Sequence, residues 1–194
     1  MNRFILCLSL IALVGCSASK KTSNASLKSY TIENLEKLNS EEIKRNFADA
    51  RIQEGSDMFE EGTVQRAYSI LYPDTEDELM LIWKNTAKNE LYEIRTKGKG
   101  KWISSTGIKI GDSYEKLVEK NGKDISFYGF GWDYGGAVLW NGGKLENSGL
   151  RVFLQPEGNP PSKFYGDKIA KATAQEIEDM NVSVASIVIN YEVE

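Results

Sequence analysis

The sequence predicts a single α+β domain over residues 30–194, built from an antiparallel sheet of about six to eight strands and two or three short helices. Three observations support this class. Strand-like segments follow one another with short polar turns between them, which favours antiparallel neighbours. Helix start signals occur in only a few places, each ahead of a short apolar stripe. The chain of 194 residues is 41% hydrophobic and 27% charged, enough to bury one core.

The first elements expected are a short helix and a meander of strands. Ser40 is interpreted as the N-cap of the helix, because two acids follow it directly, and Ile43 and Phe47 give the helix an apolar face. Residues 53–63 are rich in acids and predict a loop or weak strand. Strands are expected after this segment, at residues 64–72, 78–84, 90–97 and 102–105.

Two groups of acidic residues fall in the turns of this region. They are Glu54, Asp57, Glu60 and Glu61, followed by Asp74, Glu76, Asp77 and Glu78. Each group lies beside Gly or Pro, and no apolar run would enclose it and raise a carboxyl pKa. We interpret both groups as solvated surface, with weak Ca²⁺ binding or catalysis as the alternatives.

The clearest local signal is a capped helix within residues 107–122. Asp112 is expected as its N-cap, with Glu115 completing a capping box, and Asn121-Gly122 ends the helix with a left-handed residue. This segment resembles the repeat shared by the BamE (SmpA/OmlA) outer-membrane assembly lipoproteins and β-lactamase inhibitory protein. The resemblance implies a protein-binding module of two helices and an antiparallel sheet. The whole chain is more similar to a group of uncharacterised bacterial lipoproteins.

An aromatic and glycine-rich run covers residues 127–140. If the run is extended, a period of two places Tyr128, Phe130, Trp132 and Tyr134 on one face. One interpretation is an exposed platform for a glycan ring or a partner peptide, and the other is a curved strand whose aromatics fill the core. We expect a division of roles: Phe127, Phe130 and Leu139 are structural, and the candidate binding residues are Tyr128, Trp132, Asp133 and Tyr134.

The remaining elements are a hairpin, a helix and a final strand. Residues 138–155 predict a β-hairpin with its turn at 141–144. Thr173 and Glu176 form a capping box for a short helix that buries two apolar side chains, Ile177 and Met180. Residues 182–193 carry apolar residues on both faces, which predicts a central strand.

The N-terminus carries the signal that locates the protein. A basic start and an apolar run end in Leu13-Val14-Gly15-Cys16, which matches the lipobox of bacterial lipoproteins. The resemblance implies that residues 1–15 are a signal peptide and that Cys16 is lipidated, with acyl chains such as palmitate anchoring it in a membrane. Residues 16–29 then form the lipidated Cys and a flexible tether. By resemblance to Gram-negative lipoproteins, Ser17 after the Cys suggests the outer membrane, and the lack of an acidic run after Cys16 favours its periplasmic face.

Composition limits the possible functions. The net charge is -4, which argues against a nucleic-acid partner, and the absence of His excludes His-dependent catalysis and most zinc sites. No cofactor, metal site or catalytic residue is expected. The sequence therefore predicts a lipid-anchored, non-catalytic envelope lipoprotein that acts as a protein-binding or scaffold module. The alternative is a carboxylate-dependent glycan-processing enzyme or a glycan-binding protein.

Overall fold

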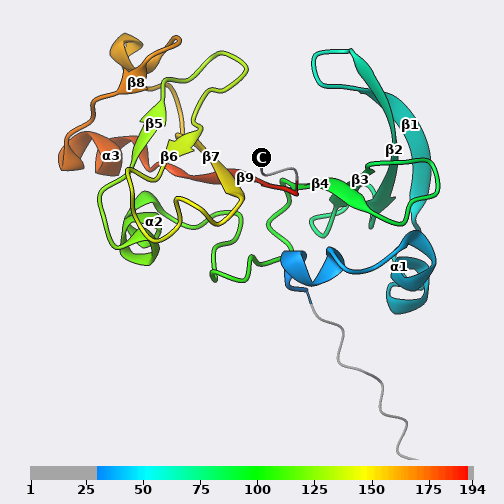
Figure 1. Ribbon diagram of the computed structural model, residues 1–194. Coiled ribbons are helices and arrows are strands. Elements are labelled where there is room, and N and C mark those ends of the chain that lie inside the picture. Colours follow the sequence, from blue (N-terminus) through cyan, green and yellow to red (C-terminus); the bar gives the residue numbers. More distant parts are fainter. Residues whose placement is uncertain (1–29, 192–194) are drawn as a thin grey trace, which may run out of the picture.

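The computed structural model describes residues 30–191, so the predicted signal peptide, Cys16 and tether lie outside the described residues. Within this range the fold is α+β, as predicted (Figure 1). The helical elements are η1 (Ile32–Leu35), α1 (Ser40–Asn46), α2 (Tyr114–Asn121), η2 (Ser162–Phe164) and α3 (Ala174–Met180). The strands are β1 (Gln53–Phe59), β2 (Val64–Leu71), β3 (Leu79–Trp83), β4 (Leu91–Thr96), β5 (Ser126–Tyr128), β6 (Val138–Leu139), β7 (Leu150–Gln155), β8 (Ile169–Ala170) and β9 (Ser183–Asn190).

The strands form two antiparallel sheets. The larger has six strands in the order β1-β2-β3-β4-β9-β7, and the smaller has three in the order β6-β5-β8. The strand β9, last in the sequence, lies between β4 and β7, which confirms the prediction of a central strand at the C-terminus. It therefore joins the N-terminal meander to the second half of the chain, so the main sheet is complete only when both halves have folded.

One face of the main sheet packs on the core. Ile94 of β4, Ile187 of β9 and Val152 of β7 are each 1% exposed. In Figure 1 η1, α1 and α2 lie below the level of β4, β9 and β7, while the β1-β2 hairpin and the small sheet rise on the two sides above it. The opposite face of β4, β9 and β7 therefore forms the floor of a saddle that opens away from these helices.

The helix starts differ from the predicted ones by one residue. The N-cap of α1 is Asn39, whose side chain forms a capping box with Glu42, and Ser40 is the first helical residue. The N-cap of α2 is Ser113 rather than Asp112. The Asp112 carboxylate accepts bonds from the Lys109 amide and the Lys116 ammonium instead, so it is not available to cap the helix. The end of α2 at a left-handed Gly122, and the Thr173 capping box of α3, are confirmed.

Two strand predictions need correction, and one open alternative is decided. Of the loop or weak strand predicted at residues 53–63, the structure has the strand: β1 is an edge strand paired with β2. Residues 102–105 form no ladder, since Ile103 makes only an isolated bridge to Thr31. The hairpin over residues 138–155 is wrong, because β6 pairs with β5 and β7 pairs with β9. Between these two segments the strand pairing is limited to an isolated bridge between Ala137 and Phe153.

The aromatic run is a short strand followed by turns. Because β5 ends at Tyr128, the period of two does not continue, and Phe130 is 7% exposed while Tyr134 is 53% exposed. Phe127, at 1% exposed, is structural as expected, whereas Leu139 is only half-buried. Gly136 turns the chain with a φ of 78° and brings it alongside β7.

Candidate functional site

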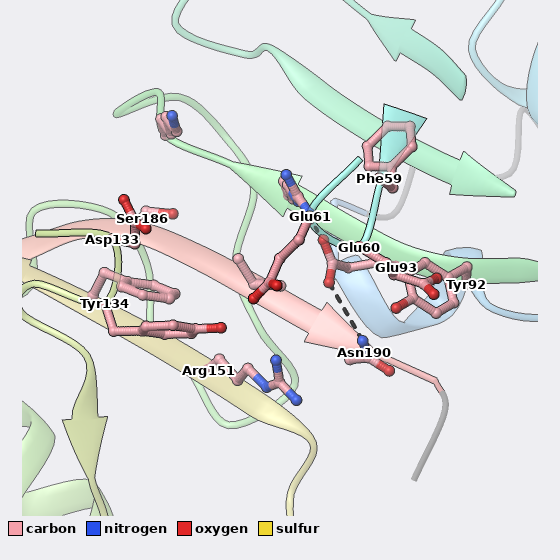
Figure 2. Close-up of a pocket in the computed structure, with 14 residues that line it drawn as sticks. Phe59, Glu60, Glu61, Tyr92, Glu93, Asp133, Tyr134, Arg151, Ser186 and Asn190 are labelled. Atoms are coloured by element: carbon pink, nitrogen blue, oxygen red, sulfur yellow. Dashed lines mark hydrogen bonds and ion pairs between the residues drawn. The ribbon is translucent and has the colours of Figure 1, made fainter. Parts of the chain in front are cut away.

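An open cavity of about 820 Å³ lies on the outer face of the main sheet. Its floor is formed by β4, β9 and β7, and its two walls are the turn after β1 and the turn at residues 131–136 (Figures 1 and 2). The cavity is thus lined by segments that are far apart in the sequence. A cavity of this size suits a small ligand or a part of a larger one.

The register of the three strands determines which side chains lie side by side on the floor. Arg95 of β4 and Arg151 of β7 are both opposite Val188 of β9, so the three residues form one row across the sheet. Side chains directly opposite one another in antiparallel strands lie on the same face. The next row contains Glu93 and Asn190, which are also paired across β4 and β9.

A buried carboxylate organises one end of this floor. Glu93 is 5% exposed, accepts a hydrogen bond from Asn190 Nδ2 at 3.3 Å, and forms an ion pair with Arg95 Nε (Figure 2). This ion pair occupies the Nε–H donor of the Arg95 guanidinium. Its two terminal nitrogens make no hydrogen bond within residues 30–191 and lie at the cavity, where a ligand could reach them.

The wall after β1 is held by an ion pair and an aromatic ring. Glu60 Oε1 accepts from Arg66 Nη2 at 2.5 Å and from Arg66 Nε at 2.9 Å. The Arg66 guanidinium lies 3.8 Å from the centre of the Tyr92 ring. Burial raises the pKa of the Tyr92 hydroxyl, and the negative charge of Glu60 adds to this shift. The Glu60 carboxylate is thus engaged by Arg66 within the wall, whereas its neighbour Glu61 extends into the cavity (Figure 2).

The other wall contains the aromatic residues predicted from the sequence. Trp132 lies between Tyr128 and Tyr134, with ring centres 5.6 and 5.5 Å apart, and its indole N–H donates to the Gly129 carbonyl at 2.7 Å. Of the four predicted binding residues, Asp133 and Tyr134 line the cavity. Tyr128 and Trp132 are half-buried behind them and do not line it. Their contacts fix the wall that presents the other two.

Charged groups of both signs remain unpaired in the cavity. Among the described residues, no ion pair involves Glu61, Asp133, Lys97 or Arg151. Of these four unpaired groups, the two cations lie at the floor and the two acids on the walls. The sequence contains a signal for part of this floor: Glu93, Arg95 and Lys97 alternate with other residues in the strand predicted at 90–97, a pattern that places three charges on one face.

Two classes of feature are absent from the described region. No helix within residues 30–191 is both long and apolar enough to cross a bilayer. Over the same residues, no group of three or more acidic or Cys side chains is arranged to hold a metal ion.

Comparisons with known proteins carry no argument about this chain. No protein-family model matches the chain, and no curated protein matches it in sequence. Among solved structures it is similar to the uncharacterized protein yfeY from Escherichia coli. The TM-score is 0.46 and the sequence identity 14%, over 76% of this chain and 87% of that chain. A similarity of this degree carries no functional argument, so the function must be inferred from the residues of the cavity.

Proposed function

We propose that this chain is a lipid-anchored, non-catalytic binding module of the bacterial cell envelope, held at the periplasmic face of the outer membrane through Cys16. Its partner, an envelope protein or glycan, docks in the cavity above β4, β9 and β7. The anchor is inferred from the lipobox and the binding role from the cavity. No nucleic acid, cofactor or metal takes part.

One observation carries the binding role. The cavity gathers unpaired charges of both signs and an exposed aromatic ring, Tyr134, on a face of the sheet that could have been covered by apolar packing. These charged side chains are solvated in the open cavity, and a ligand that covers them must supply partners of opposite charge or hydrogen-bonding groups, which makes the site selective. The walls are fixed by the Arg66 ion pair and the Trp132 contacts, which preorganises the site.

The anchor is tested by the two cysteines of the chain. Cells are fed an alkyne-labelled palmitate, and the protein is examined for label and for partition into a detergent phase. Cys16→Ala should lose the label and leave the detergent phase, whereas Cys7→Ala, which changes a residue of the signal peptide, should keep both. Label that persists in the Cys16→Ala protein would refute the anchor.

The binding role is tested by photocrosslinking in intact cells. A benzophenone amino acid replaces Tyr134 in one protein and Tyr165 in a matched control. Both tyrosines are exposed, at 53% and 41%, but only Tyr134 lines the cavity. Irradiation should give an adduct, read by intact-mass spectrometry, from position 134 and not from position 165. Equal yields at both positions, or none at 134, would contradict the proposal.

The rival function, carboxylate-dependent glycan processing, has one observation in its favour. Glu61 and Asp133 approach the same cavity from opposite walls, and neither forms an ion pair within the described part of the chain. A pair of carboxylates flanking the substrate is what glycoside hydrolysis requires. Incubating the protein with cell-wall glycan and assaying for new reducing ends separates the two functions. Product that is lost in both Glu61→Gln and Asp133→Asn would establish the rival.

A further inference from the structure

We propose that Arg95 and Arg151 form a carboxylate-binding subsite on the cavity floor, and that the ligand is a saccharide carrying a carboxylate group. This inference rests on the proposed function, because it names the chemical class of the partner that docks in the cavity. It follows from three features: the position of the two arginines, the acids on the walls, and the exposed tyrosine.

The two arginines rise from the same row of the floor, on either side of Val188. Their strands are separated only by β9, so their Cα atoms lie about 10 Å apart, the width of two strand spacings. Val188 stands between them and offers no polar group that could occupy either guanidinium. Two long side chains that rise from positions at this separation can meet above the intervening valine.

Both guanidinium groups have donors to spare. Arg95 donates through Nε to Glu93, which holds its side chain on the floor and leaves its terminal nitrogens for a ligand. Arg151 is exposed, and no hydrogen bond or ion pair involves its side chain among residues 30–191. Lys97 adds a third cation to the same cavity. The planar fork of a guanidinium matches a carboxylate with two parallel bonds, so the floor favours a compact anion of this geometry.

The walls favour a hydroxyl-bearing ligand around that anion. When ionised, Glu61 and Asp133 can accept hydrogen bonds but cannot donate them, so they bind hydrogen-bond donors such as sugar hydroxyls. The half-exposed ring of Tyr134 offers an apolar face to the C–H surface of a pyranose. In Figure 2 Glu61 extends over β9 from one wall and Tyr134 lies on the opposite side of that strand, with Arg151 beside β9. One sugar-acid residue could thus meet the acceptor, the ring and the cation together.

Other ligand classes fit less well. A neutral saccharide would cover Arg151 without supplying a partner for its charge. A peptide with several acidic residues would place negative charge against Glu61 and Asp133, which is unfavourable at short range. A ligand with one localised carboxylate and several hydroxyls avoids both costs.

The test is a titration with matched saccharides. The full-length protein, purified in a polyoxyethylene detergent that contains no sugar, is titrated calorimetrically with cellobiouronic acid and cellobiose, and with digalacturonic acid and galactobiose. The members of each pair differ in their carboxylates. We expect at least one acid to bind tenfold or more tightly than its neutral counterpart, with a preference that weakens as salt is added. A tetraglutamate peptide serves as the competing class.

Variants assign the preference to the subsite. Arg151→Gln should abolish the tenfold preference while leaving the melting temperature unchanged, because the Arg151 guanidinium has no hydrogen bond or ion pair within the described residues. Arg45→Gln is the matched control, since Arg45 is an exposed arginine on α1, away from the cavity, and the preference should persist. A preference that survives in Arg151→Gln would overturn the assignment.

Two further outcomes would overturn the ligand class. These are equal or absent binding of both acids relative to their neutral counterparts, and tighter binding of tetraglutamate. Photocrosslinking at Tyr134 distinguishes this failure from failure of the proposed function. An adduct at position 134 together with no sugar-acid preference means that the cavity binds a partner of another class. Failure of both experiments removes the binding role itself.

Discussion

Replacing Gly136 by alanine should destabilise the fold at the turn that carries the aromatic wall. Gly136 has a φ of 78°, and its amide and carbonyl connect two strands: the amide donates to the Tyr128 carbonyl at 2.9 Å, and the carbonyl accepts from the Leu154 amide at 2.8 Å. A Cβ at this position would lie 2.0 Å from the Leu154 carbonyl oxygen. Because that neighbour is backbone, the turn itself has to move.

The expected cost follows from these contacts. Placing an L-residue with a side chain in the left-handed region costs about 1–2 kcal/mol. A shift large enough to relieve the clash weakens both hydrogen bonds of Gly136, each with a net value of about 1 kcal/mol. We therefore expect Gly136→Ala to lower the free energy of unfolding by about 3–4 kcal/mol.

Gly158 supplies a matched control. Its φ is 80°, nearly that of Gly136, but no atom lies within 4 Å of the position that a Cβ would take. Gly158→Ala should cost only the conformational term, about 1–2 kcal/mol. The two variants should thus differ by about 2 kcal/mol in urea unfolding followed by tryptophan fluorescence, at unchanged m-values. If Gly136→Ala costs no more than Gly158→Ala, the turn is not held against β7 as described.

Three further predictions concern other positions. Trp132→Ala should lower the free energy of unfolding by about 1–2 kcal/mol, because the half-buried indole loses its bond to the Gly129 carbonyl. A thermal melt checks this, and an unfolded variant would place Trp132 in the core. Asn121→Asp should be more destabilising than Asn121→Ala in the same assay, since the fully buried amide donates to two carbonyls that would then face a carboxylate. The hydrogen bond from Lys101 lowers the pKa of Asp77, so this carboxylate stabilises the fold above its ordinary pKa of 3.8, and the gain is lost as the pH falls through the lowered value. Asp77→Asn should flatten the acid limb of stability measured from pH 5 downward, and an unchanged limb would contradict this origin.

The sequence predicted those parts of the fold whose interactions are local. The Thr173 capping box and the left-handed Gly122 each depend on residues within four positions, and both are present. The strands β2, β3 and β4 were recognised because each pairs with its neighbour in the sequence. Even here local rules left a choice at α1, where Asn39 and Ser40 are both good N-caps and the structure uses the first.

The predicted hairpin at residues 138–155 failed for a non-local reason. The prediction placed both extended segments correctly. The second segment, β7, pairs with β9 and not with β6. The pairing of β7 with β9 buries apolar side chains of both strands, including Val152 and Ile187. Local sequence patterns do not show which strand a segment will pair with when the partner lies much later in the sequence.

Sequence and tertiary structure therefore determined different parts of the site. The aromatic and glycine-rich run at residues 127–140 indicated Asp133 and Tyr134, two of the residues that line the cavity. The arginine row was decided only by the insertion of β9, whose Asn190 meets Glu93 across 97 residues of sequence. Caps and turns are set by hydrogen bonds between near neighbours, which the sequence displays directly. The cavity depends on strand order and register, and these are fixed by the burial of the shared core, to which both halves of the chain contribute.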